Sequence, residues 1–253
     1  MTASSTLLER QIAEQLAVVH ERIARAAARS GRRAESVQLI GVTKTHGLDV
    51  IRAAYACGLR HFGENRVEEA EGKIAALEAA AMPGITWHMI GHIQSRKTAD
   101  IAALFSRVHS VARMKVASRL SQACVTSGQT LPVLLEVNLS GEESKDGYDL
   151  SRWPEDAGQL ETFCTEAEQV MALPALMVEG LMTMAPYSAD PEAARPVFRR
   201  LRALRDTLRD RFGGAGWDAL SMGMSGDYEV AIEEGATMIR LGTILFGTRP
   251  PQP

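Results

Sequence analysis

Eight short runs of apolar and β-branched residues recur along this chain, each followed by a segment with the spacing of an amphipathic helix. Several runs are apolar at both odd and even positions, which is typical of strands buried on both faces of a parallel sheet. This alternation predicts a single (β/α)8 TIM barrel, with an open doubly wound sheet as the alternative. The runs cover residues 37–44, 61–64, 86–93, 107–111, 132–138, 177–184, 219–224 and 237–242.

An extra helix is expected before the barrel. Apolar residues follow one another at spacings of three and four over the first thirty positions, at Leu8, Ile12, Leu16, Val19 and Ile23. This pattern predicts an N-terminal helix with its connection over residues 1–33 and the barrel over 37–247. Because no Pro-, Gly- or Ser-rich linker interrupts the chain, we expect one domain over residues 1–253.

Charge and composition exclude several classes of protein. Of the 253 residues, 28 are Lys or Arg and 31 are Asp or Glu, so the net charge of −3 does not favour nucleic acid or an anionic membrane. The apolar runs fall short of the roughly 18 residues that a membrane span needs. Cys57, Cys124 and Cys164 form no CxxC or Cys/His cluster, so no disulfide framework or zinc site is predicted. Acidic residues near the N-terminus argue against a signal peptide, and we expect a cytoplasmic protein.

A lysine closes the first predicted strand. Lys44 follows the apolar run at the point where a barrel places its functional residues, the carboxyl ends of the strands. A lysine amine that faces a cavity there can form a Schiff base with a carbonyl compound. A strand-end lysine that reaches solvent is the alternative.

Small residues and hydroxyls follow the seventh and eighth predicted strands. Residues 221–226 and 240–243 supply glycines together with the hydroxyls of Ser225 and Thr243. These are the positions where barrels commonly bind a phosphate, because backbone N–H groups can approach the anion closely. A lysine after the first strand and a phosphate cradle after the last two together indicate pyridoxal 5'-phosphate (PLP), which carries both an aldehyde and a phosphate.

Arg240 lies within the same cluster. A guanidinium beside the pyridine nitrogen of PLP would donate a hydrogen bond and keep that nitrogen unprotonated, which makes the ring a poor electron sink. The alternative is an ion pair with Glu229, Glu233 or Glu234 on the preceding helix.

Six segments resemble the pyridoxal phosphate homeostasis protein family, in the same order and over nearly the whole chain. That family is similar to the N-terminal barrel of alanine racemase. The segments are Gly-Val-Thr-Lys-Thr at 41–45, Phe-Gly-Glu-Asn at 62–65, Trp-His-Met-Ile-Gly-His-Ile-Gln-Ser-Arg-Lys at 87–97, Gly-Leu-Met-Thr-Met at 180–184, Ser-Met-Gly-Met-Ser at 221–225 and Ile-Arg-Leu-Gly-Thr-Ile-Leu-Phe-Gly at 239–247.

The resemblance implies a role for each of nine residues. Lys44 would hold PLP as a Schiff base, and Arg240 would face the pyridine nitrogen. Asn65 would lie at the ring or its phenolic oxygen. The remaining residues would hold the phosphate (Ser225, Gly242, Thr243 and, as a further candidate, Ser221) or line the pocket (His88 and Met222).

The chain departs from the usual family pattern at a few positions. Thr43 stands where serine is common, and His46 and Gly47 stand where lysine and proline often follow the PLP lysine. His92 and Arg96 replace the more usual proline and asparagine.

Three further features have ordinary explanations. His88 and His92 lie four residues apart, about 13 Å along a strand, which is too far to share one metal ion, so no metal site is predicted. Lys145, in the segment 144–147, either belongs to a solvated turn or binds an anion such as a second PLP. The Arg-rich segment 195–211 is expected to be the solvated outer face of a barrel helix.

The residues favour a PLP-binding protein over an enzyme. It would hold PLP on Lys44 and buffer or deliver it, with PLP-dependent apo-enzymes as candidate partners and a monomer as the expected state. Racemisation needs two opposed bases, and the resemblance implies no C-terminal domain to supply the catalytic tyrosine. The alternatives are an amino-acid racemase that uses Lys44 with Tyr187 or His46, and a Schiff-base aldolase without cofactor.

Overall fold

The computed structural model describes residues 3–142, 145–213 and 216–247 and contains a closed barrel of eight parallel strands. The strands pair in the order β4-β3-β2-β1-β9-β8-β7-β5, and a pairing between β4 and β5 closes the ring, so the TIM-barrel prediction is confirmed and the open sheet is wrong. The barrel strands are β1 (Gln38–Val42), β2 (His61–Glu64), β3 (Thr86–Met89), β4 (Arg107–Val111), β5 (Leu131–Asn138), β7 (Leu176–Met182), β8 (Ala219–Ser221) and β9 (Met238–Leu241). A further strand, β6 (Tyr148–Asp149), pairs with β5 alone among the described residues.

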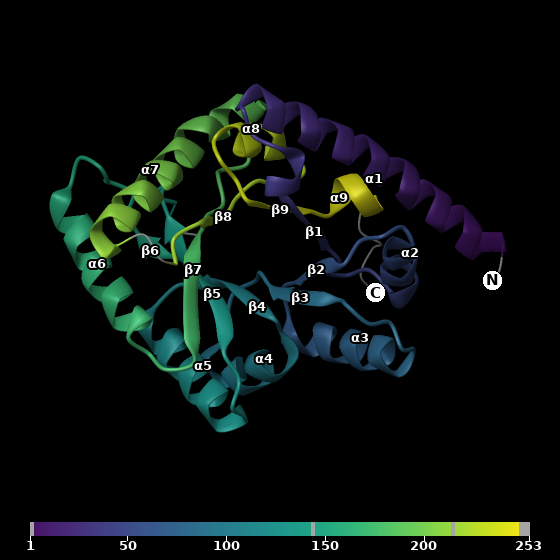
Figure 1. Cartoon of the computed structure of the whole chain (residues 1–253), viewed down its shortest axis with the longest axis horizontal. Helices are drawn as coiled ribbons and strands as arrows, with labels where there is room; N and C mark the ends of the chain where they lie inside the picture. The colour runs from purple at the N-terminus through teal and green to yellow at the C-terminus, as the bar shows by residue number, and fades with distance from the viewer. Residues whose placement is uncertain (1–2, 143–144, 214–215, 248–253) are drawn as a thin grey trace.

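Helices surround the strands on all sides (Figure 1). The helix α1 (Ala3–Arg29) precedes the barrel as predicted, and it packs against α2 and α8 through Ile12, Leu16, Val19 and Ile23, which are all buried. The other helices are α2 (Leu48–Ala56), α3 (Val67–Ala79), α4 (Thr98–Leu104), α5 (Met114–Ser127), α6 (Ala157–Met171), α7 (Arg195–Phe212), α8 (Tyr228–Glu233) and α9 (Thr243–Phe246), with short 3-10 turns η1 (Ala34–Ser36), η2 (Ser95–Lys97) and η3 (Pro191–Ala194).

Several strands end earlier than their apolar runs. The run at 86–93 forms a strand only to Met89, and the run at 219–224 only to Ser221. At Gly91 the chain passes so close to its neighbour that a Cβ atom would lie 2.4 Å from the backbone oxygen of Asn65. The ends of these runs are therefore loop residues, and they shape the mouth of the barrel.

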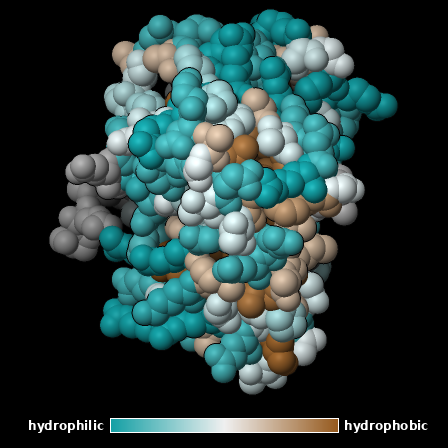
Figure 2. Space-filling view, turned by 90° about the vertical axis from the view of Figure 1, so that its left-hand side faces the viewer, coloured by the Kyte–Doolittle hydropathy of each residue, from teal (hydrophilic) through white to brown (hydrophobic). Residues whose placement is uncertain are grey.

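The helix α7 is the barrel helix predicted for the Arg-rich segment, but only some of its arginines are exposed to solvent. Its apolar stripe of Phe198, Leu201, Leu204 and Leu208 is fully buried against the barrel. Arg199, Arg209 and Arg211 are exposed, whereas Arg200 donates to the backbone oxygens of Leu139 and Leu150. Figure 2, which shows the side that carries α6 and α7, is mostly hydrophilic. None of the helices among the described residues combines the length and the hydropathy needed to cross a bilayer.

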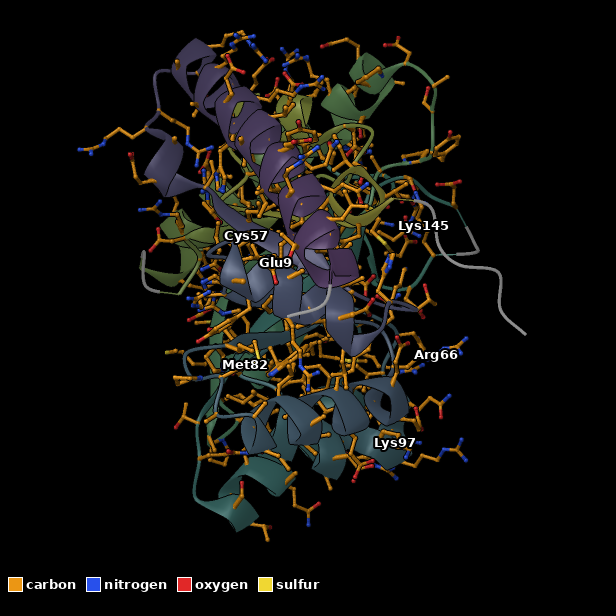
Figure 3. The ribbon with its side chains drawn as sticks, turned by 90° about the vertical axis from the view of Figure 1, so that its right-hand side faces the viewer. Glu9, Cys57, Arg66, Met82, Lys97 and Lys145 are labelled. Carbon is orange, nitrogen blue, oxygen red and sulfur yellow. The ribbon has the colours of Figure 1, made fainter. Side chains whose placement is uncertain are left out.

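The two ends of the barrel carry different residues (Figure 3). Arg66, Lys97 and Lys145 follow strands and lie at one end, whereas Cys57 and Met82 precede strands and lie toward the other. The first of these ends is the carboxyl end of the parallel strands, the usual location of the functional site in a barrel.

Candidate functional site

A cavity of about 380 Å³ opens at the carboxyl end of the strands. Its walls come from the ends of β1 and β9 and from the loops that follow β1, β2, β3, β7, β8 and β9. It therefore brings together segments separated by up to about two hundred residues of chain. Six predicted site residues line it: Lys44, Asn65, Ser225, Arg240, Gly242 and Thr243.

A buried cluster holds the loop that carries Lys44. The Nζ of Lys73 donates to the backbone oxygen of Thr43 at 2.8 Å, to Glu64 at 2.8 Å and to Glu69 at 2.6 Å. The Thr43 hydroxyl donates to the same Glu64 oxygen at 2.7 Å, and the backbone N–H of Thr45 donates to Glu69 at 2.5 Å. Both neighbours of Lys44 in the chain are thus fixed by charged groups.

The backbone beside Lys44 also has an uncommon conformation. Thr45 has a φ of 67°, in the left-handed region that a β-branched residue rarely adopts. The surrounding hydrogen bonds must offset the cost of this conformation, which is of order 1–3 kcal/mol. The strain and the cluster together place the Lys44 side chain on the cavity wall.

The sequence did not reveal this cluster as part of the site. Glu64 is fully buried and Lys73 is 7% exposed, and the burial of the Glu64 carboxyl raises its pKa against the opposing effect of Lys73. Glu64 belongs to the Phe-Gly-Glu-Asn segment, but its partner lies one helix later. An acidic strand end followed nine residues later by a lysine on the buried face of a helix was the available signal.

The far side of the cavity is rich in hydrogen-bond donors. Ser225 and Thr243 line it, and within the described part of the chain their hydroxyls have no hydrogen-bond partner. Gly242 lies where a Cβ would come within 3.2 Å of the Val42 backbone oxygen, so a side chain there would crowd β1. The turn before α8 is held by Asp227, whose carboxylate accepts from the backbone N–H of Met224 at 2.6 Å.

Arg240 is buried at the base of the cavity. It is 5% exposed and donates to the Ser221 hydroxyl at 2.5 Å and to the Thr183 backbone oxygen at 3.0 Å, which leaves other N–H groups for a ligand. Burial lowers its pKa to about 10, so it remains a cation at neutral pH. The alternative ion pair is wrong. The glutamates of α8 and its C-cap bind other arginines, as in the pairs Arg29–Glu229, Arg195–Glu233 and Arg199–Glu234.

The other three predicted residues lie elsewhere than on the cavity wall. His88 is fully buried inside the barrel, between two other histidine rings. Ser221 lies beneath the cavity as the partner of Arg240. Met222 is fully buried in the main hydrophobic core. The residues that line the cavity do not include His88 or Met222, because β3 directs His88 into the barrel interior and Met222, directly after β8, packs into the hydrophobic core.

Glu136 on β5 is a buried acid close to Arg240. Its side chain is 4% exposed, and burial raises its pKa to about 7, with a smaller contribution from the charge of Asp146. The native pKa lies above the unfolded value, so the stabilisation is complete below about pH 4.5 and is lost as the pH rises to about 7.

Glu136→Gln should therefore change the pH dependence of stability. Between pH 4.5 and pH 8 the wild type is expected to lose up to about 3 kcal/mol of unfolding free energy relative to this variant. Urea unfolding of both proteins across this pH range measures the difference. Parallel stability curves would show that Glu136 has an ordinary pKa.

The two histidines considered as metal ligands are separated. His88 is inside the barrel, whereas the exposed His92 lies 2.6 Å from the Asp146 carboxylate through its Nδ1. Among the described residues no group of three or more His, Cys, Asp or Glu side chains could hold a metal ion. His46, at another departure from the family pattern, lines the cavity and packs edge-on against Phe246.

Lys145 lies close to the cavity rather than in free solvent. Its Nζ donates to the Met184 backbone oxygen at 3.2 Å and to the Ser140 hydroxyl at 3.2 Å, and it forms an ion pair with Glu142. Met184 itself lines the cavity. Ser144, in the same predicted turn, lies outside the described residues.

Comparison with protein families and curated sequences gives a consistent result. The model of the alanine racemase N-terminal domain matches residues 16–250. The pyridoxal phosphate homeostasis protein of Pseudomonas aeruginosa is 47% identical, with 94% of this chain and 96% of that protein covered. The protein of the same name from Aquifex aeolicus is 42% identical, with 93% of this chain and 97% of that protein covered.

Solved structures agree with these relatives. PipY of Synechococcus elongatus with PLP bound superposes with a TM-score of 0.79 at 35% identity, over 93% of this chain and all of that one. Alanine racemase of Clostridium difficile has a TM-score of 0.69 at 15% identity, over 96% of this chain and 58% of that one, which shows a shared fold alone.

Proposed function

Because this chain belongs to the alanine racemase N-terminal domain family and, within it, to the pyridoxal phosphate homeostasis proteins, we propose that it binds PLP. The site is the cavity lined by Lys44 and Arg240, with PLP held as a Schiff base on Lys44. The protein buffers PLP or delivers it to PLP-dependent apo-enzymes, without turning over a substrate of its own. We propose further that it acts as a single-domain monomer in the cytoplasm.

The observation that carries this proposal is the fit between the cavity and the two ends of PLP. A primary amine lines one wall, and the hydroxyls of Ser225 and Thr243, which have no hydrogen-bond partner in the described part of the chain, line another. PLP supplies an aldehyde for the first and a phosphate for the second. The glycines at positions 226 and 242 leave the backbone open to close approach by an anion.

The protein side chains define the state in which the ring would be held. Arg240 can only donate, so toward a ring nitrogen it would present an N–H and withhold a proton. Asn65 lines the cavity directly after β2, and its amide would donate a hydrogen bond to the phenolic oxygen of PLP. A ring nitrogen left unprotonated draws electrons weakly, which disfavours carbanion chemistry and favours storage.

A binding role also agrees with the surroundings of Tyr187 and His46, the two residues considered as the second base that racemisation requires. Tyr187 lines the cavity but is 98% exposed, so packing does not fix its hydroxyl opposite Lys44. His46 is 8% exposed and packs against Phe246. The test is exchange of the α-hydrogen of common amino acids in deuterated buffer. No exchange is expected with protein and PLP present, and exchange at a catalytic rate would favour a racemase.

Thr243→Val should weaken PLP binding by about 1–3 kcal/mol, because it removes one hydroxyl donor to the phosphate and keeps the side-chain shape. Titration of PLP against the protein by absorption measures the change. Thr126→Val is the matched control, because Thr126 lies on the exposed face of α5 and bonds only within that helix. Equal affinities of Thr243→Val and the wild type for PLP would show that the phosphate does not bind at Thr243.

A further inference from the structure

A row of hydrogen-bonded side chains crosses the interior of the barrel and ends at Arg240. It begins on β1, passes along β2, β3 and β4, and then crosses to β8 and β9. Since β4 and β8 are not neighbouring strands, the link between them spans the inside of the barrel. The members, joined in order at 3.0, 3.1, 2.9, 2.8 and 2.5 Å, are Gln38, His61, His88, His109, Ser221 and Arg240. We call this row the histidine relay.

The central histidines are in their neutral forms. His88 and His109 are fully buried, and burial lowers the pKa of His88 to about 3 and that of His109 well below its usual value. Arg107 and Arg240 add positive charge around them, and burial and Arg107 also lower the pKa of His61. Each neutral ring carries one N–H and one acceptor nitrogen, so every ring in the row must donate on one side and accept on the other.

Arg240 sets the direction of the row. Its guanidinium has no acceptor, so it must donate to Ser221. The Ser221 hydroxyl hydrogen then points to Nδ1 of His109, its other hydrogen-bond partner among the described residues. If His109 donated to Ser221 instead, the buried hydroxyl hydrogen of Ser221 would have no acceptor among the described residues. With Nδ1 of His109 accepting, its Nε2–H donates to His88, and Nε2–H of His88 donates to His61.

The far end of the row agrees with this direction. Nε2–H of His61 then needs an acceptor at Gln38. The Oε1 atom of Gln38 is buried without a partner, while the amide nitrogen lies 3.0 Å from His61. Turning this amide by half a rotation brings the oxygen to the His61 N–H and removes the unsatisfied acceptor.

We propose that the histidine relay is a positioning device for Arg240, in which His61, His88 and His109 all carry their proton on Nε2. The relay holds one edge of the Arg240 guanidinium through the hydrogen bond to Ser221, and the other N–H groups remain available to the cavity. Its bearing on PLP rests on the proposed function, but the arrangement of protons does not. His109 and Ser221 are thus positioning residues that support the ligand through Arg240.

The first test uses the protein without PLP. Long-range proton–nitrogen NMR spectra of ¹⁵N-labelled protein distinguish the two neutral forms of histidine and the charged one. We expect all three rings in the Nε2–H form at pH 8, and we expect His88 and His109, whose pKa values burial lowers strongly, to keep that form down to pH 5.5. Nδ1–H rings, or titration of His109 in this range, would overturn the proposal.

Two variants test which end sets the direction. Gln38→Met should leave all three rings in the Nε2–H form. Ser221→Ala should change the spectrum of His61, which is two rings removed from His109, because the donor that fixes the row is gone. Leu134→Val is the control for altered packing, since Leu134 lies in the barrel interior outside the relay. A His61 spectrum unchanged by Ser221→Ala would contradict the relay.

The last measurement connects the relay to the ligand. His109→Leu should weaken PLP binding by about tenfold, and His109→Asn, which can still accept from Ser221, should recover much of the loss. Wild-type protein that fails to bind PLP would reject the proposed function and leave the NMR result standing. Equal affinity in wild type and His109→Leu would instead reject the positioning role alone.

Discussion

Lys44→Ala is expected to abolish covalent retention of PLP while the barrel stays folded. Lys44 lies in the turn after β1, with its side chain on the cavity wall and only partly buried, so truncation removes little packing. No other lysine of the chain lines the cavity among the described residues. The variant should show neither the absorption band of a bound Schiff base nor an adduct after reduction with borohydride.

The matched control is Lys115→Ala, because Lys115 is exposed on α5 and away from the cavity. It should bind and retain PLP as the wild type does. Thermal unfolding of both variants shows whether the fold survives. Retention of a reducible PLP band by folded Lys44→Ala would contradict the assignment of the lysine.

Lys73→Met is expected to have the largest effect on stability, a loss of about 3–5 kcal/mol of unfolding free energy. The change leaves the fully buried Glu64 carboxylate without its cation. It also frees the backbone oxygen of Thr43 and loosens the support of Lys44. Urea unfolding measures the loss, and weaker PLP binding by the folded fraction should accompany it.

Two comparisons distinguish a buried charge from lost packing. The double variant Lys73→Met with Glu64→Gln should recover part of the loss, because no unpaired charge remains. The loss in the single variant should also be smaller at pH 5 than at pH 8, since burial raises the pKa of Glu64 and protonation removes the charge. Lys97→Met, at a more exposed ion pair with Glu68, is the control. A pH-independent loss equal in the single and double variants would contradict this explanation.

The fold was predictable because buried parallel strands have a strong signature. Runs such as 132–138 are apolar at both parities, and the structure forms β5 over Leu131–Asn138. Strand ends were less predictable. The run at 86–93 continues past Met89 into a loop, because its last residues stay apolar while Gly91 packs against the neighbouring loop. Hydrophobicity records burial, and Ile93 in the loop after β3 is buried as a strand residue would be.

Site residues that follow the end of a strand could be predicted from the sequence. Whether a residue reaches the cavity or lies below it in the barrel was harder to predict. Ser225 and Ser221 lie four residues apart, yet only the first reaches the cavity, because β8 ends between them. His88 was placed in the pocket although β3 carries it into the relay below. The link between Glu64 and Lys73 depends on how α3 folds back on β2, and the only sequence signal for it was the spacing of nine residues between the two charges.

The assignment of Lys44 as the PLP-binding lysine is tested most directly by peptide mapping of the wild-type protein after incubation with PLP and reduction with borohydride. The chain has five lysines, at 44, 73, 97, 115 and 145, so mass spectrometry can assign the adduct without ambiguity. We expect stoichiometric pyridoxyl modification of Lys44 and little elsewhere. Absence of an adduct, or modification centred on another lysine such as Lys145, would contradict this assignment.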